Sequence, residues 1–343
     1  MQQLILPQHY DPGMDIKETE IAIKFVKDYF ERRLAEALNL IRVSAPLFVL
    51  ASSGLNDNLN GYERPVSFGI REQGDVACEI VHSLAKWKRQ ALKRYQFTPG
   101  EGLYTDMNAI RRDEDTDNLH SIYVDQWDWE RVIRREDRNQ ETLKQIVTKI
   151  YQVIRDTEQH VYKRYPQIKP ILPETITFVT TSELEDRFPE LTPKEREREI
   201  AKEYGAVFLM QIGGALKSGK PHDGRAPDYD DWSLNGDILV DYPLLDTAVE
   251  LSSMGIRVDE EALKKQLAIS GCEDRAQLPF QKSLLAGELP LTIGGGIGQS
   301  RLCMVFLHRA HIGEVQSSIW PQDMVDQLSL IHIYTKDRII QAI

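Results

Sequence analysis

Apolar residues recur every three or four positions near the start of the chain, which is the spacing of a helix with one buried face. The pattern runs through residues 16–38 and predicts an amphipathic helix there. Its apolar positions are Ile23, Val26, Phe30, Leu34 and Leu38. Further helices are predicted at residues 86–95, 141–165, 193–204, 259–270, 279–286 and 299–308. The mixed charges of residues 141–165 and 193–204 are typical of solvated helix faces.

Short β-rich runs lie between these helices. They predict strands at residues 40–43, 47–51, 66–70, 77–81, 103–110, 121–130, 176–180, 207–212, 237–242 and 247–251. In residues 121–130 a polar face with Gln126 and Asp128 alternates with an aromatic face that carries Trp127 and Trp129. Because the strands come in pairs and the helices are inserted irregularly, we expect an α+β fold whose central sheet is mostly antiparallel and flanked by helices.

The composition is that of a globular protein with a large core. Of the 343 residues, 41% are hydrophobic and 8% aromatic, so disorder is not expected. No linker rich in Pro, Gly and Ser divides the chain, and we expect a single domain over residues 1–326. Residues 327–343 are interpreted as a C-terminal tail outside the pattern of that domain.

Charge and cysteine content narrow the choice of partners and compartment. The net charge of -11 repels a phosphate backbone, so a nucleic-acid partner is not expected. Three scattered cysteines, Cys78, Cys272 and Cys303, indicate neither a disulfide framework nor a zinc site, but buried thiols in a reducing compartment. The first residues lack a signal-peptide pattern and no apolar stretch is long enough for a membrane span, so we expect a cytoplasmic protein.

Two glycine-rich segments could be mistaken for nucleotide-binding loops. Residues 214–220 have the spacing of a phosphate-binding P-loop, but Pro221 stands where Ser or Thr should hold magnesium, and the segment is interpreted as a surface turn. Residues 294–298 lack the ribose-binding acid of a dinucleotide fold. They are interpreted as a turn leading into a helix whose N-terminal amides favour an anion or another electron-rich group, or else as a tight packing turn.

Several charged residues are candidates for nucleotide binding. Arg111, Arg225 and Arg301 could each hold a phosphate through a guanidinium fork, although an arginine of this kind taken alone is more often part of a surface salt bridge. Asp237 and Glu250 lie among apolar residues, and a buried acid must be paired or must bind a cation. Magnesium carrying the phosphates of ATP is one interpretation. An ion pair with Arg257 is the other.

Six segments resemble the ammonia-dependent aspartate–ammonia ligases. They are VHSLAKWKRQ (81–90), GEGLY (100–104), YVDQWDWE (123–130), RAPDYDDW (225–232), ELSSMGIR (250–257) and IGGGIGQSR (293–301). The resemblance covers about residues 15–325, and the motifs are long and unusual in composition. It implies the catalytic core of a class II aminoacyl-tRNA synthetase, and a homodimer whose interface uses the first long helix and the strand entering Pro46.

The same resemblance implies where the substrates bind. Arg111 would contact the α-phosphate of ATP, Arg301 the adenine, Arg225 and Arg257 the phosphates, and Asp237 and Glu250 the Mg²⁺ ion. The residues implied for aspartate are Asp57, Ser83, Lys88, Gln126, Asp128, Asp230, Ser252 and Gly294. Their chemistry agrees with a zwitterion, because Lys88 can neutralise a carboxylate while Asp57 and Asp230 accept from the α-ammonium.

The family's reaction makes asparagine, AMP and pyrophosphate through a β-aspartyl-adenylate. Arginines and magnesium offset the charge that develops on phosphorus. Ammonia then attacks the mixed anhydride, and Asp57 or Asp128 is the predicted base that takes up the extra proton. Because the chain begins Met1-Gln2-Gln3 and has no cysteine before Cys78, free ammonia rather than glutamine is the expected nitrogen donor.

The chain departs from the family pattern at two places, and two other functions are alternatives to the ligase interpretation. The family usually carries a longer loop between Ser233 and Leu234, so a trimmed lid with impaired turnover is expected here, and the tail beyond Asp326 has no family likeness. A true aminoacyl-tRNA synthetase would need an anticodon-binding domain, for which no segment is evident. A non-catalytic paralogue would be expected to lack Arg111, Glu250 or Arg301, and all three are present.

Overall fold

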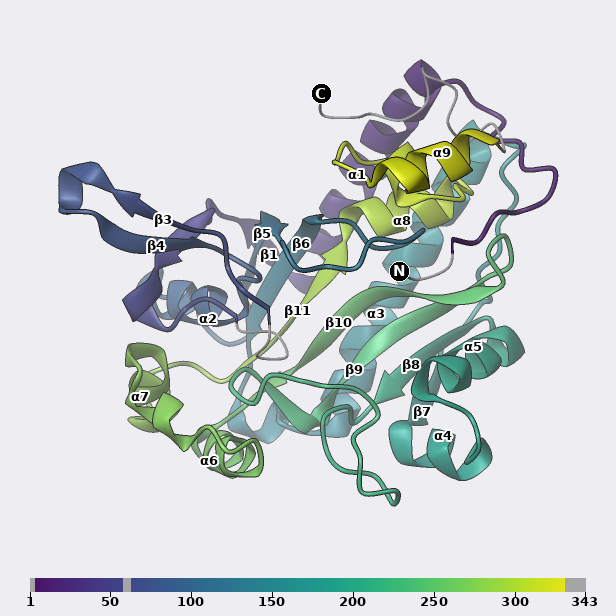
Figure 1. Ribbon diagram of the computed structural model, residues 1–343. Coiled ribbons are helices and arrows are strands. Elements are labelled where there is room, and N and C mark those ends of the chain that lie inside the picture. The colour runs from purple at the N-terminus through teal and green to yellow at the C-terminus, as the bar shows by residue number, and fades with distance from the viewer. Residues whose placement is uncertain (1–3, 58–62, 331–343) are drawn as a thin grey trace.

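A large sheet runs through the middle of the molecule in this computed structural model, which describes residues 4–57 and 63–330 (Figure 1). Within those residues the sheet has eight strands. Their order is β1 (Leu40–Arg42), β5 (Gly102–Ile110), β6 (Tyr123–Val132), β11 (Thr292–Gly298), β10 (Thr247–Arg257), β9 (Asp230–Tyr242), β8 (Ala206–Met210) and β7 (Thr177–Thr180). Neighbours pair antiparallel except at the edges, where β1 and β5, and β7 and β8, are parallel. The predicted mostly antiparallel sheet is confirmed.

Three helices cover one face of this sheet and bury the main core. They are α1 (Ile16–Leu38), α3 (Gln140–Arg164) and α8 (Gln299–Phe306), and α1 and α3 lie behind the sheet in Figure 1. The predicted aromatic face of β6 points into this core, where Trp127 packs against Phe30 of α1 with ring centroids 4.8 Å apart and Trp129 is fully buried. Because side chains alternate along a strand, the opposite face of β6, which carries Gln126 and Asp128, points away from this core.

The opposite face of the sheet is covered only at its two sides. Helix α2 (Ala85–Arg94) packs against β6 and β11, while α5 (Pro193–Tyr204) packs against β8, β9 and β10 beside α4 (Thr181–Arg187). The helices α6 (Glu260–Ile269) and α7 (Pro279–Leu285) share a small core of their own. Between α2 and α5 the middle of this face borders a cavity.

Two smaller elements complete the description. A three-stranded sheet of β2 (Phe48–Leu50), β4 (Val76–Ile80) and β3 (Ser67–Ile70) projects to one side of the large sheet, at the left of Figure 1. The last described helix, α9 (Gln322–Leu330), lies near α1 and α8. The predicted tail, residues 327–343, therefore begins inside α9, and from residue 331 it lies outside the described residues. None of the helices in the described part of the chain has the length and apolar character that a bilayer crossing requires.

Two sequence interpretations about strands are corrected by the structure. The glycine-rich residues 294–298 were predicted to form a turn, but they belong to β11, a central strand between β6 and β10. Strands β9 and β10 are also longer than predicted. The expected trimming of a lid between Ser233 and Leu234 agrees with the structure, because both residues lie inside β9 and the strand passes through this point without a loop.

The expected solvated face of α5 is partly wrong. Arg196 and Glu197 are buried, because Arg196 donates to the carbonyl of Phe188 at 2.9 Å and Glu197 accepts from His222 at 3.0 Å. By contrast, the P-loop-like residues 214–220 form the predicted turn, which the amide of Leu216 closes by donating to the carbonyl of Lys220 at 2.9 Å.

Candidate active site

A cavity of about 390 Å³ lies on the open face of the sheet between α2 and α5. It is lined by nearly all the residues that the sequence predicted for substrates. Those present are Asp57, Ser83, Lys88, Arg111, Gln126, Asp128, Arg225, Asp230, Glu250, Ser252, Arg257 and Arg301. Gly294 and Asp237 do not line it, whereas Gly295 and Gly296 do. The structure thus brings together residues that are up to 244 positions apart in the chain (Asp57 and Arg301).

The floor of the cavity is made by β6 and β11. Gln126, Asp128 and Glu130 stand on the polar face of β6, as the alternation predicted, and β11 lies beside them. A Cβ at Gly296 would collide with the side chains of Gln126 and Asp128, and a Cβ at Gly294 would collide with Glu130. Glycine is therefore needed in this central strand because the neighbouring acids occupy the space that a side chain would fill.

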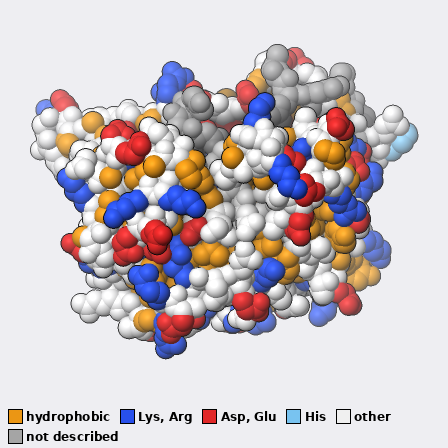
Figure 2. All heavy atoms as spheres, turned by 90° about the horizontal axis from the view of Figure 1, so that it is seen from below, with side chains coloured by type: hydrophobic (Ala, Val, Ile, Leu, Met, Phe, Trp, Pro, Cys, Tyr) orange, Lys and Arg blue, Asp and Glu red, His pale blue; other side chains and the backbone are white. Residues whose placement is uncertain are grey.

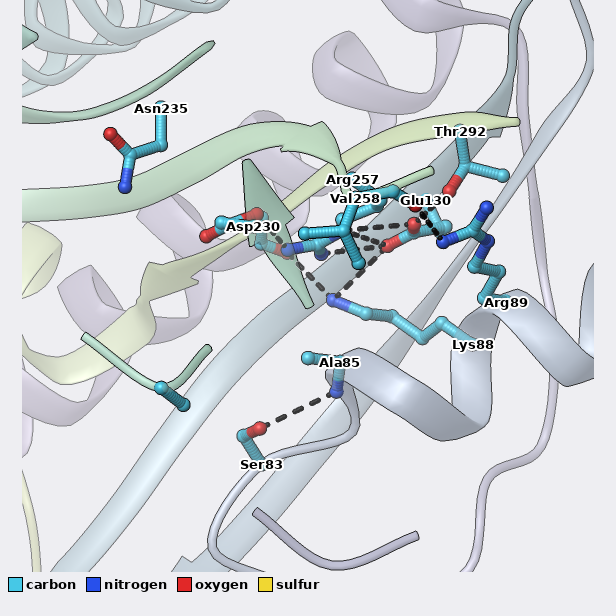
Figure 3. Close-up of polar contacts among 12 residues, drawn as sticks. Ser83, Ala85, Lys88, Arg89, Glu130, Asp230, Asn235, Arg257, Val258 and Thr292 are labelled. Carbon is cyan, nitrogen blue, oxygen red and sulfur yellow. Dashed lines mark hydrogen bonds and ion pairs between the residues drawn. The ribbon is translucent and has the colours of Figure 1, made fainter. Parts of the chain in front are cut away.

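A buried network of charges lies at one end of the cavity (Figure 3). Arg257 donates to Glu130 at 2.9 and 2.7 Å and to Asp230 at 2.5 Å. Lys88 lies 3.3 Å from Asp128 and 4.0 Å from Glu130, and it donates to the carbonyl of Gly295 at 2.9 Å. A buried charge is tolerated only when it is paired and hydrogen-bonded, so these contacts hold the network in one geometry.

Burial and pairing shift the pKa values of this network in different directions. Burial lowers the pKa of Lys88, and the charge of Arg257 adds to this effect, while Asp128 and Glu130 oppose it. Burial alone would raise the pKa of Glu130, but Arg257, Lys88 and a 2.6 Å hydrogen bond from Thr292 hold it below its ordinary value. Glu130 is therefore a fixed anion beneath the cavity.

Asp230 behaves differently from Glu130. Burial raises the pKa of its carboxyl, and Arg257 offsets this only in part. The pKa of the Asp230 carboxyl is thus raised where that of Glu130 is lowered, and a nearby cation would favour its ionised form.

Asp57 forms the wall next to α2. The hydroxyl of Ser83 donates to Asp57 Oδ2 at 2.9 Å, and His82 Nδ1 lies 3.0 Å from the carbonyl oxygen of Asp57. Asn56 Oδ1 accepts from the amides of Asp57 and His82 at 3.0 and 2.8 Å. These contacts fix a buried carboxylate at the cavity surface.

The other end of the cavity is rich in arginines. Arg111 follows β5, Arg301 stands in the first turn of α8, and Arg225 precedes β9. Arg301 donates to the carbonyl of Glu250 at 3.1 Å, and Arg225 is paired with Asp237 and with Asp223. Three guanidinium groups around one space suit the binding of phosphates.

The alternative interpretation, in which Asp237 and Glu250 form an ion pair with Arg257, names the wrong partner. Asp237 pairs with Arg225 and not with Arg257. Burial raises the pKa of Asp237 to about 7, with Glu250 adding to the rise and Arg225 opposing it. Burial alone would also raise the pKa of Glu250, but Arg301, Arg225 and Lys194 hold it below its ordinary value.

The first turn of α8 is not free to bind an anion, as its sequence had suggested. The amide of Ser300 donates to Asp125 Oδ1 at 3.1 Å, so a carboxylate of the protein itself occupies this helix end. Asp125 also accepts from Lys27 of α1 at 3.1 Å. The part of the prediction that holds is the position of Arg301, which lines the cavity from this helical turn.

Sequence reasoning missed several residues of the site. Glu130 was noticed only as part of a strand pattern, since its pairing with Arg257 joins positions far apart in the chain. Tyr229 and His120 line the cavity, but neither stood in a pattern that indicates chemistry. Lys194 was included in a helix face predicted to be solvated. Within the described residues, no group of three or more His, Cys, Asp or Glu side chains could hold a metal ion.

Comparison with known proteins identifies close relatives in sequence. The family model described as "Aspartate-ammonia ligase" matches residues 17–331. The aspartate–ammonia ligase of Clostridium tetani is 65% identical over 324 residues, which is 94% of this chain and 95% of that protein. The one of Ruminiclostridium cellulolyticum is 64% identical over 329 residues, which is 96% of this chain and 98% of that protein.

Solved structures show the same fold at low sequence identity. The asparaginyl-tRNA synthetase from Pyrococcus horikoshii, complexed with asparaginyl-adenylate, superposes with a TM-score of 0.63 at 15% identity and covers 86% of this chain and 67% of its own. The aspartyl-tRNA synthetase from Entamoeba histolytica gives 0.59 at 16% identity over 87% of this chain and 58% of its own. The predicted class II synthetase-like fold is confirmed.

Proposed function

The chain belongs to the aspartate–ammonia ligase family, and we propose that its cavity is the place where aspartate, ATP and ammonia meet. The reaction joins ammonia to the side-chain carboxylate of L-aspartate at the expense of ATP and gives L-asparagine. One observation carries the assignment of the site: a single cavity has an arginine-rich end at Arg111, Arg225 and Arg301 and an acid–lysine end around Lys88.

The acid–lysine end suits a zwitterion. Lys88 lines the cavity, donates to Gly295 and lies 3.3 Å from Asp128, and its positive charge would attract a carboxylate of the substrate. The network holds three acids, Asp128, Glu130 and Asp230, and two cations, Lys88 and Arg257, so its formal charge is -3 + 2 = -1. The α-ammonium of aspartate would neutralise it.

The remaining residues would shape the aspartate site. Asp57 would accept from the α-ammonium together with Asp230, and Ser83, Gln126 and Ser252 would surround the substrate. Gly294 does not line the cavity, so we assign the close backbone approach to Gly295 and Gly296.

The arginine-rich end suits the nucleotide. We assign Arg111 to the α-phosphate, Arg301 to the adenine and Arg225 to the outer phosphates, because each lines the cavity away from the Lys88 network. Arg257 is instead assigned to the aspartate end, since its guanidinium is held by Glu130 and Asp230.

Glu250 and Asp237 fit a magnesium ion brought by ATP. Mg²⁺ usually takes one or two carboxylates and completes its shell with phosphate oxygens and water. The like charge of Glu250 adds to the raised pKa of Asp237, so the two acids lie close enough for a cation to relieve their repulsion. Glu250 lines the cavity and would contact the ion, with Asp237 behind it. A bound Mg²⁺ would offset charge on the phosphate oxygens.

Activation and amidation follow from this placement. An oxygen of the β-carboxylate attacks the α-phosphorus of ATP, the bond to the bridging oxygen breaks, and pyrophosphate leaves with the electron pair. Arg111 would stabilise the charge on the α-phosphoryl oxygens. Ammonia then attacks the β-carbonyl carbon of the adenylate, AMP leaves, and a carboxylate takes the extra proton from nitrogen.

We retain Asp57 and Asp128 as the candidates for that base. Both line the cavity near Lys88. The variants Asp57→Asn and Asp128→Asn keep the shape of the side chain and remove the basic oxygen. The base variant should form adenylate, measured as aspartate-dependent exchange of pyrophosphate into ATP, but amidate it slowly. A variant that amidates preformed adenylate at the normal rate does not lack the base.

We propose that two copies of the chain form a homodimer, through α1 and the strand entering Pro46 as the family resemblance implies, and through the three-stranded sheet that follows them. The three-stranded sheet and the residue just before β2 expose large apolar side chains in one region. These are Leu47, Phe48, Leu50 and Phe68. Phe48 and Phe68 pack edge to face, with ring centroids 5.0 Å apart, so the apolar surface is continuous across β2 and β3. A second copy would remove this surface from water.

A tRNA acceptor is the alternative that the synthetase-like fold raises. A tRNA-binding surface would need a continuous basic region. On the face seen in Figure 2, Lys and Arg side chains are interspersed with Asp and Glu side chains across the described residues. This face therefore offers tRNA no continuous basic region.

A single assay tests the proposed function. Purified protein is given ATP, Mg²⁺ and aspartate, and both pyrophosphate and asparagine are measured with and without ammonium and with tRNA. We expect asparagine only when ammonium is present, in amounts equal to the pyrophosphate released, and without dependence on tRNA. Aspartyl-tRNA formation, or no aspartate-dependent pyrophosphate, would refute the proposal.

A further inference from the structure

Six basic side chains line the cavity among the described residues, and one of them differs from the others in exposure. Lys194 is 73% exposed. The others are Lys88 at 1%, Arg257 at 3%, Arg225 at 14%, Arg301 at 21% and Arg111 at 24%. Lys194 therefore stands at the mouth of the cavity, while the five other cations stand deeper.

Lys194 is held at this mouth by a chain of two contacts. Its ammonium donates to Glu197 Oε2 at 2.9 Å, three residues further along α5. The other oxygen of Glu197 lies 3.0 Å from Nε2 of His222, and both side chains are buried. Asp223, the residue after His222, and Arg225 line the cavity. Glu197 and His222 thus connect α5 to the loop that carries Arg225.

We propose that Lys194 binds the β- and γ-phosphates of ATP and the pyrophosphate product, and that Glu197 and His222 position it. The inference rests on the proposed function, because it needs the arginine-rich end to hold the nucleotide. It adds a residue outside the motifs that carry the family resemblance, on a helix whose charged face the sequence had placed in solvent.

The ion pairs that the deeper cations already form favour Lys194 as a ligand of the outer phosphates. Arg257 is held by Glu130 and Asp230, and Arg225, which we assign to the outer phosphates, shares its charge with Asp237 and Asp223, so a second cation is needed there. A buried guanidinium that held pyrophosphate through several bonds would also release it slowly. A solvated ammonium is a compact charge on a flexible stem, so it can attract the outer phosphates and release them.

The groups that face Lys194 agree with this role. Besides Glu197, its ammonium experiences the charges of Glu250 and Asp223, and these three acids hold its pKa above the ordinary value. Lys194 is therefore a cation near neutral pH. The negative charge of a polyphosphate would compete with these acids for it.

The test compares Lys194→Met with Lys202→Met, a control on the same helix whose lysine pairs with Asp246 and does not line the cavity. The dissociation constants of magnesium pyrophosphate and of AMP are measured by calorimetry, and KM for ATP by steady-state kinetics. Lys194→Met should weaken pyrophosphate binding and raise KM for ATP by about tenfold, the loss of one solvent-exposed charged contact. The affinity for AMP should change no more than in Lys202→Met.

Two further variants separate binding from positioning. Lys194→Arg keeps the charge and should restore most of the pyrophosphate affinity. Glu197→Gln should weaken pyrophosphate binding less than Lys194→Met while leaving AMP binding intact. An unchanged pyrophosphate affinity in Lys194→Met, or an equal loss of AMP and pyrophosphate binding, overturns the inference. If the unmodified protein binds neither AMP nor ATP, the proposed function itself fails.

Discussion

At the scale of single residues, Glu130 is the side chain on which the site's geometry most depends. It is fully buried and accepts from Arg257 and Thr292. Glu130→Gln leaves Arg257 with one fewer charged partner, so we expect a loss of about 3 to 5 kcal/mol in the free energy of unfolding. Urea unfolding followed by circular dichroism measures this. The matched control is Glu288→Gln, which removes an exposed pair with Lys93 and should leave the unfolding free energy unchanged.

The stability difference between the unmodified protein and Glu130→Gln depends on pH, and the direction of the change follows from the pKa of Glu130. The pKa of Glu130 is held below its ordinary value of 4.5, so its contribution is complete above that value and is lost as the pH falls through the folded-state pKa. The stability difference between the unmodified protein and Glu130→Gln should therefore be constant from pH 7 to pH 5 and shrink below about pH 4. A difference that does not change down to pH 3 would show that the charge of Glu130 is not its cause.

At the scale of elements, β11 determines the space available to the substrate. Gly296→Ala puts a methyl group against Gln126 and Asp128, so both side chains must move. We expect kcat/KM for aspartate to fall about 100-fold, since small displacements of positioning groups have large effects on rate. Gly214→Ala is the control, because open space surrounds that glycine, and it should retain full activity. Normal kinetics in Gly296→Ala would mean that aspartate binds elsewhere.

An element was predictable from the sequence when the residues that determine it lie close together in the chain. The two faces of β6 and the buried stripe of α1 were predictable, because the period of apolar positions is local. Strand β11 was not predictable from its residues, since glycine has little β propensity and is tolerated there only because of Glu130, Gln126 and Asp128 on the next strand. The buried face of α5 depends on His222 from a distant loop.

Most residues of the candidate site were predicted through resemblance to a family. The structure adds which charged side chains pair with one another. Residue types indicated that Arg257 could meet an acid, but its partners are Glu130 and Asp230 rather than Asp237 or Glu250. Partner choice among many acids is a property of the folded chain, because it requires the registers of β6, β9 and β10.

At the scale of the whole molecule, the apolar surface on β2 and β3 predicts the assembly state. The chain has a mass of 39.4 kDa, and light scattering should give twice this value for the unmodified protein. Phe48→Glu places a charge in the proposed interface and should raise the dimer dissociation constant roughly 30-fold or more. Ile269→Glu alters an exposed apolar residue on α6 and should stay dimeric. A monomeric unmodified protein contradicts the proposal, as does a dimer unaffected by Phe48→Glu.

The glycines of β11 also constrain how this pocket could change over evolutionary time. The part of the floor made by β11 is bare backbone with no side chain left to trim, so any substitution there can only make the chamber smaller. Acceptance of a longer dicarboxylic acid would have to come from other lining residues, by shortening side chains such as Gln126 on β6. The strand thus acts as a one-way size limit, which favours retention of a four-carbon substrate.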